Sequence, residues 1–325
     1  MNSPAVLAAT PLGKAAAIVR DYVLRMYYVV DEVPRLDRLR LTPLLLGVEY
    51  LVYRVDSLAE RNATVDLDAV RNDDYEAFHT YKKAFEKVLR ALGAWNGDVA
   101  FLVDEAERFV RLENGATSRG TVTRGDVLAM VELRPTDVRL LRAMAFALRG
   151  RPMEPATRDL LWPVEVLADL ANDLRHYEQD VAAGTLNVYA AFVELYGDAA
   201  ATELRREADR YESMFLERLS ALPPERRARI AEVCRPRYAA ALEPYPRVVT
   251  ARPVPAPPVR PPGTYLRKGV VACAVLTAGV LAAAAHRRGR PRSSPLPIRS
   301  PLHLLPLHLL PLHLLPLHPK RGRAS

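Results

Sequence analysis

The sequence predicts an all-α fold, and three observations support that prediction. From about Pro11 to Leu242, apolar residues recur at spacings of three and four, which is the period of a helix with one buried face. Alternation of apolar and polar residues over the length of a strand is scarce in the same region. The chain also lacks a strand–helix–strand pattern and a glycine-rich phosphate loop. We therefore expect one helical body over residues 1–243.

The expected helices follow one another between short turns. Glycine, proline and asparagine clusters mark the turns at Asn96-Gly97, Asn114-Gly115, Gly150 to Pro152, Gly184, Gly197 and Pro223-Pro224. Each segment between them has the apolar period of a helix. The expected helices are 12–31, 41–61, 73–93, 96–112, 124–132, 136–149, 155–183, 185–196, 199–220 and 224–241.

Charge is divided unevenly along the chain. The net charge is +8, but from Pro244 onward there are 13 Lys or Arg residues and no Asp or Glu. Residues 1–243 therefore carry 33 basic against 38 acidic residues, a net charge of −5. A mildly acidic body disfavours nucleic-acid binding. The basic tail indicates contact with anionic lipid, or the flank of a membrane segment.

Only two cysteines, Cys234 and Cys273, occur in the chain. This number and spacing disfavour a disulfide framework and fit a reducing compartment. The first residues do not have the pattern of a secretory signal. We therefore expect a cytoplasmic body, with membrane attachment through the C-terminal part. The sequence indicates no oligomeric state.

The C-terminal part contains three successive segments. Residues 244–268 are rich in proline and predict an extended, semi-rigid linker. Residues 269–286 include 17 uncharged residues from Gly269 to Ala285, which is close to the shortest length that spans a bilayer, so this segment is a candidate transmembrane or membrane-surface helix. Residues 287–325 form a basic tail of low complexity with a repeated Pro-Leu-His-Leu-Leu unit.

The run from Asn172 to Asp180 is the most informative stretch for function. It lies in a helical pattern from about Pro163 to Ala183, in which Pro163 suits the first turn and Gly184 the position after the end. On a helix, Asn172, His176 and Asp180 share one face. An amide oxygen, an imidazole and a carboxylate in one stripe can bind a divalent cation, and Mg²⁺ prefers oxygen ligands. A solvated polar face has the same spacing, but the apolar residues 161–171 favour a stripe that faces a cavity.

These residues resemble the second metal-binding motif of class I terpene synthases, Asn-Asp-x-x-Ser/Thr-x-x-x-Glu. Asn172 and Asp173 match its first two positions, while His176 stands at the Ser/Thr position and Asp180 at the Glu position. Asn187 follows at the spacing that is common in the family. Squalene and phytoene synthases share the fold and show a related pattern, Asn-x-Leu-Arg-Asp-x-x-Glu-Asp.

The resemblance implies an Asp-rich motif on a facing helix. Asp56 and Glu60 are the preferred candidates, because they follow the apolar run 44–53 at a spacing of four. The rival candidates are Asp31 and Glu32, together with Asp37. Asp73 and Asp74 are better suited to the start of a helix.

The resemblance also implies basic residues that contact diphosphate. Arg124 has suitable spacing before the motif, with Arg119 as the alternative. Arg252 lies at the position of a family Arg-Tyr pair, but Pro253 replaces the tyrosine.

The activity implied by the resemblance is Mg²⁺-dependent ionisation of an allylic isoprenoid diphosphate (geranyl, farnesyl or geranylgeranyl). The carbocation would form in an apolar pocket, for which the aromatic candidates are Tyr50, Tyr53, Trp95, Phe101, Trp162 and Tyr189. The alternatives are a prenyl transferase of the squalene/phytoene synthase type, an inactive homologue, and a tail-anchored helical interaction protein.

Overall fold

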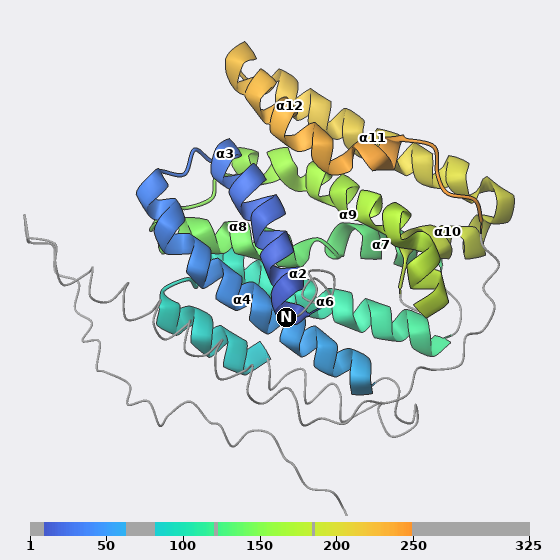
Figure 1. The fold of residues 1–325 in the computed structure, drawn as a ribbon, viewed down its shortest axis with the longest axis horizontal. Coiled ribbons are helices and arrows are strands. Elements are labelled where there is room, and N and C mark those ends of the chain that lie inside the picture. The colour runs from blue at the N-terminus through green and yellow to red at the C-terminus, as the bar shows by residue number, and fades with distance from the viewer. Residues whose placement is uncertain (1–9, 63–81, 120–122, 184–185, 249–325) are drawn as a thin grey trace, which may run out of the picture. The chain divides into compact units, whose positions relative to one another are not determined.

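The computed structural model describes residues 10–62, 82–119, 123–183 and 186–248, all within one compact unit (Figure 1). The side chains of residues 54–62 and 113–119 lie outside that description. The elements in the described residues are helices joined by turns, without a strand. The all-α expectation is therefore confirmed for this part of the chain.

The N-terminal segment is helical but not uniformly α-helical. It consists of α2 (Pro11–Ile18), the π-helical η1 (Val19–Tyr27) and α3 (Tyr28–Val30), where the sequence predicted one helix over 12–31. The hydroxyl of Thr10 caps its start by accepting a hydrogen bond from the Gly13 N–H at 3.1 Å. The segment ends at Glu32, whose φ of 50° lies in the left-handed region.

The next helices are longer than expected. Helix α4 (Arg35–Asn62) starts before 41 and continues through Pro43. Residues 82–92 are helical, which agrees with the described part of the 73–93 prediction. Helix α6 (Gly97–Arg119) passes through Asn114-Gly115, where the sequence predicted a turn. A turn signal of two residues is overridden when the surrounding positions favour a helix.

Helices α7 (Arg124–Leu133) and α8 (Thr136–Leu148) agree closely with their predicted ranges. Helix α7 starts in a capping box, because the Thr123 hydroxyl accepts from the Asp126 N–H and the Asp126 carboxylate accepts from the Thr123 N–H.

Helix α9 (Pro155–Ala183) carries the motif and contains Pro163 in its interior. The expectation that Pro163 lies in the first turn is therefore wrong. Proline has no N–H to bond the carbonyl four residues earlier, which belongs to Asp159. The guanidinium of Arg218 donates to that carbonyl instead, so the missing bond is replaced from a neighbouring helix.

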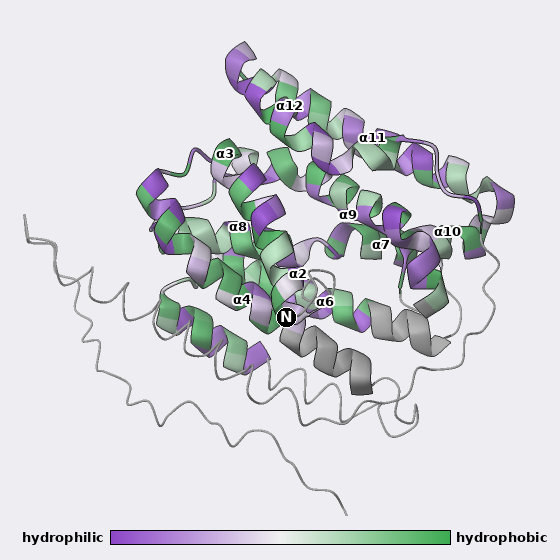
Figure 2. Cartoon of the chain, in the orientation of Figure 1, coloured by the Kyte–Doolittle hydropathy of each residue, from purple (hydrophilic) through white to green (hydrophobic). Residues whose placement is uncertain are grey.

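The remaining elements are α10 (Val188–Tyr196), η2 (Gly197–Ala199), α11 (Ala200–Ser220), α12 (Pro224–Tyr238) and η3 (Ala239–Leu242). Helix α9 packs against α10, α11 and α12, whereas α8 packs against α4, α6 and η1. Figure 2 shows hydrophobic residues along α8 and mixed hydrophobic and hydrophilic residues along α11 and α12.

The predicted linker 244–268 is described only as far as Val248, and the candidate membrane segment 269–286 and the basic tail 287–325 lie outside the described residues. Within the described residues, no helix combines the length and the apolar character that a bilayer span requires.

Candidate functional site

Helix α9 carries a longer polar stripe than the sequence indicated. Besides Asn172, His176 and Asp180, the helix holds Glu165, Asp169 and Asp173, which follow one another at a spacing of four residues and so share a neighbouring face. Glu165 and Asp173 are buried, whereas Asn172 and His176 are exposed. Two of the three predicted ligands are therefore exposed, where the sequence predicted a stripe that faces a cavity.

The exposed end of the stripe holds two of the predicted metal ligands. The Nδ1 atom of His176 lies 2.9 Å from the backbone oxygen of Asn172. A carbonyl oxygen can only accept, so Nδ1 carries the hydrogen and donates it. In neutral His176 the lone pair is then on Nε2, the nitrogen available to an electrophile or metal.

Asp173 is tied to two other helices. Its Oδ2 accepts from the guanidinium of Arg134, at the end of α7, and from the Val188 N–H at 2.7 Å, at the start of α10. Burial raises the pKa of Asp173 to about 6, although the adjacent Arg134 opposes that rise. Asp173 therefore acts as a structural junction of α7, α9 and α10.

Asp180 is half-buried and accepts a hydrogen bond from the Asn187 amide. The distance from Nδ2 to Oδ2 is 2.9 Å. The same Nδ2 donates to the backbone oxygen of Asp173 at 2.9 Å. The C-terminal half of the motif is thus fixed to the start of α10.

The preferred Asp-rich candidates, Asp56 and Glu60, lie in the last turns of α4, and their side chains lie outside the described residues. Asp73 and Asp74 also lie outside them.

The rival Asp-rich candidates do not form one group. Each pairs with a different arginine, since Asp31 binds Arg142 at 2.9 and 2.7 Å, Glu32 binds Arg229 at 2.9 Å and Asp37 lies 3.5 Å from Arg149.

Of the three basic candidates, the structure describes the side chain of Arg124. Arg124 is the first residue of α7 and is exposed, and its guanidinium lies 3.2 Å from a Glu207 carboxylate oxygen on α11. The side chain of Arg119 and the whole of Arg252 lie outside the described residues.

One buried arginine–carboxylate pair, Arg139 with Glu165, lies between α8 and α9. Glu165 accepts from Arg139 Nε at 2.9 Å and from the Tyr27 hydroxyl at 3.0 Å. The guanidinium of Arg139 also lies 3.6 Å from the ring centre of Trp162, and its Nη2 has no partner. The sequence analysis named Trp162 as a pocket candidate but did not predict the pair of Arg139 with Glu165, because sequence spacing does not show which helices face each other.

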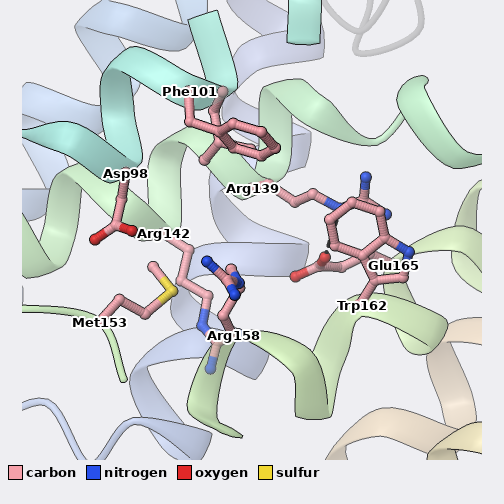
Figure 3. Close-up of a pocket in the computed structure, with 9 residues that line it drawn as sticks. Asp98, Phe101, Arg139, Arg142, Met153, Arg158, Trp162 and Glu165 are labelled. Carbon is pink, nitrogen blue, oxygen red and sulfur yellow. Dashed lines mark hydrogen bonds and ion pairs between the residues drawn. The ribbon is translucent and has the colours of Figure 1, made fainter. Parts of the chain in front are cut away.

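The cavity beside this pair is small. Figure 3 shows Phe101 and Trp162 among its lining residues, together with Arg139, Arg142 and Glu165. Its volume is about 20 Å³, enough for about one water molecule, whereas small-molecule pockets measure about 300–1,000 Å³. A larger groove of about 480 Å³ is lined by α11 and residues 243–245, and contains none of the predicted site residues.

The other aromatic candidates have separate environments. Tyr50 is buried, Lys14 lies over the ring of Tyr53, and Arg90 lies over the ring of Trp95. The Tyr189 hydroxyl donates to the backbone oxygen of Pro246 at 3.1 Å. Of the six aromatic residues, Phe101 and Trp162 are those that line the small cavity.

Glu49 is a further interior carboxyl group that the sequence reading missed. It is fully buried on α4, and neither carboxyl oxygen has a hydrogen-bond partner. Burial raises its pKa well above the usual value, and Asp137 adds to the effect. Burial likewise raises the pKa of Asp169, which also interacts with Asp137, although Arg134 opposes that rise. The sequence does give a signal for Glu49, because it is the one charged residue in the apolar run from Leu44 to Tyr53.

Among the side chains that the structure describes, no three His, Cys, Asp or Glu residues are grouped closely enough to hold a metal ion. No protein-family model, curated protein or solved structure matches the chain.

Proposed function

We propose that the protein is a Mg²⁺-dependent enzyme of the class I terpene synthase type, which ionises an allylic isoprenoid diphosphate and releases diphosphate. The observation that carries this proposal is the arrangement of the motif on α9. Asn172 and His176 are accessible on one face, and Asp180 lies on the same face and is held by Asn187.

The donor set suits a hard cation in part. Asn172 and Asp180 offer oxygen atoms, which Mg²⁺ prefers, whereas His176 offers a nitrogen. The remaining ligands would come from Asp56 and Glu60 on α4. A magnesium ion held by these residues would supply Lewis-acid stabilisation of the departing diphosphate. Arg124, which is exposed beside Glu207, is the residue we assign to diphosphate contact, with Arg252 as a second.

The test is turnover of geranyl, farnesyl and geranylgeranyl diphosphates with Mg²⁺, with hydrocarbon and alcohol products identified by mass spectrometry. We expect Asn172→Ala and Asp180→Ala each to lower turnover by about 100-fold, equivalent to about 2.7 kcal/mol. The matched control is Glu178→Ala, an exposed residue on the other side of the same helix, which should leave turnover unchanged. Full activity in both motif variants would remove the metal-site assignment.

The second candidate is a non-catalytic protein with the same fold. The specific observation in its favour is the interior between α8 and α9, where Arg139, Glu165 and Trp162 surround a cavity of about 20 Å³. A non-catalytic protein should show no Mg²⁺-dependent rise in melting temperature with diphosphate, because only a ligand that binds the folded state stabilises it.

A further inference from the structure

The first turns of α4 present a row of apolar side chains to the surface. Leu36 and Leu39 are 65% and 74% exposed, the highest values among the large hydrophobic side chains that the structure describes. The exposed Pro43 follows Leu39 at a spacing of four, so the three residues share one face. The opposite face, which includes Leu41 and Leu45, is buried, and α4 packs against α2, α8 and η1. Single exposed leucines are common, but a row of them on one helix face indicates contact with another surface.

Arginines surround this apolar row. Glu32, before α4, binds Arg229 of α12 at 2.9 Å, and Asp37 lies 3.5 Å from Arg149 at the end of α8, so three parts of the chain meet here (Figure 1). We call residues 32–40 and 149–154, together with Arg229, the α3–α4 end. This end is basic although residues 1–243 carry a net charge of −5. Its arginines are Arg35, Arg38, Arg40, Arg149, Arg151 and Arg229, and its acidic residues are Glu32, Asp37 and Glu154.

An anionic lipid surface fits this combination of side chains. Apolar side chains can enter the boundary between headgroups and lipid chains, while arginines beside them contact the lipid phosphates. Neither of the two cavities described above includes Leu36 or Leu39, so neither gives this face the groove in which a partner's helix is usually held. Two copies of the chain that met through this end would bring like charges together. Charge and shape therefore favour a bilayer over a helical partner or a second copy.

We propose that the α3–α4 end docks onto an anionic lipid surface, with Leu36 and Leu39 inserted at the level of the lipid headgroups. This inference does not depend on the proposed activity. The residues from Pro244 onward, with 13 bases and no acid, are expected to bring the chain to such a surface. Docking of the α3–α4 end then takes place within a molecule that is already bound. With lipid in excess, it sets the orientation of the body rather than the amount of protein bound.

The experiment follows the emission of a nitrobenzoxadiazole label, which shifts to the blue in an apolar environment. The label is attached to the full chain through Leu39→Cys in a Cys273→Ser background, because Cys234 is buried. The matched control carries it through Leu12→Cys in the same background. Leu12 is 48% exposed and lies in α2, at the other end of the N-terminal helical segment from the α3–α4 turn.

With vesicles of phosphatidylcholine and phosphatidylserine, we expect a blue shift for the label at position 39 and no shift for the control. Vesicles of phosphatidylcholine alone should shift neither. Equal shifts at both positions, or no shift at position 39 when the protein sediments with the vesicles, would overturn the inference. A protein that does not bind these vesicles at all would overturn it too.

A further outcome would identify a different occupant of this face. If the label at position 39 shifts without lipid, and more so as the protein concentration rises, a second copy of the chain covers Leu36 and Leu39, and the lipid inference is wrong. The proposed function has its own test in the turnover of isoprenoid diphosphates, so each of these failures leaves it standing.

Discussion

Glu49 shows how single residues set the stability of this interior. A fully buried carboxyl group without a partner is costly when charged, so the folded state favours its protonated form. The pKa of Glu49 therefore lies well above its usual value, with Asp137 adding to the effect of burial. The stabilising contribution of this proton is complete below the unfolded pKa of about 4.3 and is lost as the pH rises through the folded pKa.

Replacing Glu49 by Gln should flatten this pH dependence. Glutamine has nearly the same shape and no proton to lose, so the variant should gain stability relative to the unaltered protein between about pH 5 and about pH 8. The expected gain is about 1.4 kcal/mol for each unit by which the folded pKa exceeds the unfolded one within that range. Urea unfolding at several pH values measures it, with the exposed Glu178→Gln as control. Parallel curves for Glu49→Gln and the unaltered protein would show that Glu49 does not retain its proton.

At the scale of elements, the sequence predicted α7, α8, α9 and α11 closely, because each has a clear apolar period between strong turn signals. It did not predict the π-helical segment η1. An α-helix bonds residues four apart and a π-helix residues five apart, and over two turns both bury similar side chains, so the apolar pattern does not distinguish them. The Asn172–Asp180 stripe followed from helical spacing alone. The bond from Asn187 to Asp180 and the pair of Arg139 with Glu165 did not, because they depend on which helices pack together.

Helix α9 depends on α11 at the point where Pro163 interrupts its hydrogen bonding. The Asp159 carbonyl accepts from Arg218 in place of a backbone N–H. Replacing Arg218 by Ala should therefore leave the Asp159 carbonyl without a donor and lower the free energy of unfolding by about 1–3 kcal/mol. In a Pro163→Ala background, the N–H of the new alanine can donate to the Asp159 carbonyl. Replacing Arg218 should then lower the free energy of unfolding much less.

A double-mutant cycle of Arg218→Ala and Pro163→Ala, followed by chemical unfolding, measures this coupling. The control is Arg226→Ala, an exposed residue of α12 whose removal should change stability by less than about 0.5 kcal/mol. Equal costs of Arg218→Ala in both backgrounds would show that Arg218 does not replace the missing bond.

At the scale of the whole molecule, charge separates the helical body from the C-terminal part. The body carries a net charge of −5, and the residues from Pro244 onward carry 13 basic residues without an acid. Each Lys or Arg near an anionic lipid surface contributes about 1 kcal/mol to binding. We therefore predict that the full chain binds vesicles that contain phosphatidylserine, and that added salt weakens this binding.

The variant that tests this prediction replaces Arg287, Arg288, Arg290 and Arg292 by Gln in the full chain. Vesicle sedimentation should show a marked loss of binding. The control replaces the same number of exposed body arginines (Arg35, Arg206, Arg226 and Arg227) and should bind like the unaltered protein. Equal loss in both variants would mean that total charge, rather than the tail, directs the chain to the lipid.

The earliest helices of the chain are completed by residues that the ribosome adds much later. Tyr27 bonds Glu165 across 138 positions, Asp31 binds Arg142 across 111, and the Val29 carbonyl accepts from Arg229 across 200. Contacts of such long range require large loops to close before they contribute, which slows folding. During synthesis, the N-terminal segment therefore leaves the ribosome without the groups that will bury Tyr27 and Asp31, and its final structure has to wait for α8, α9 and α12.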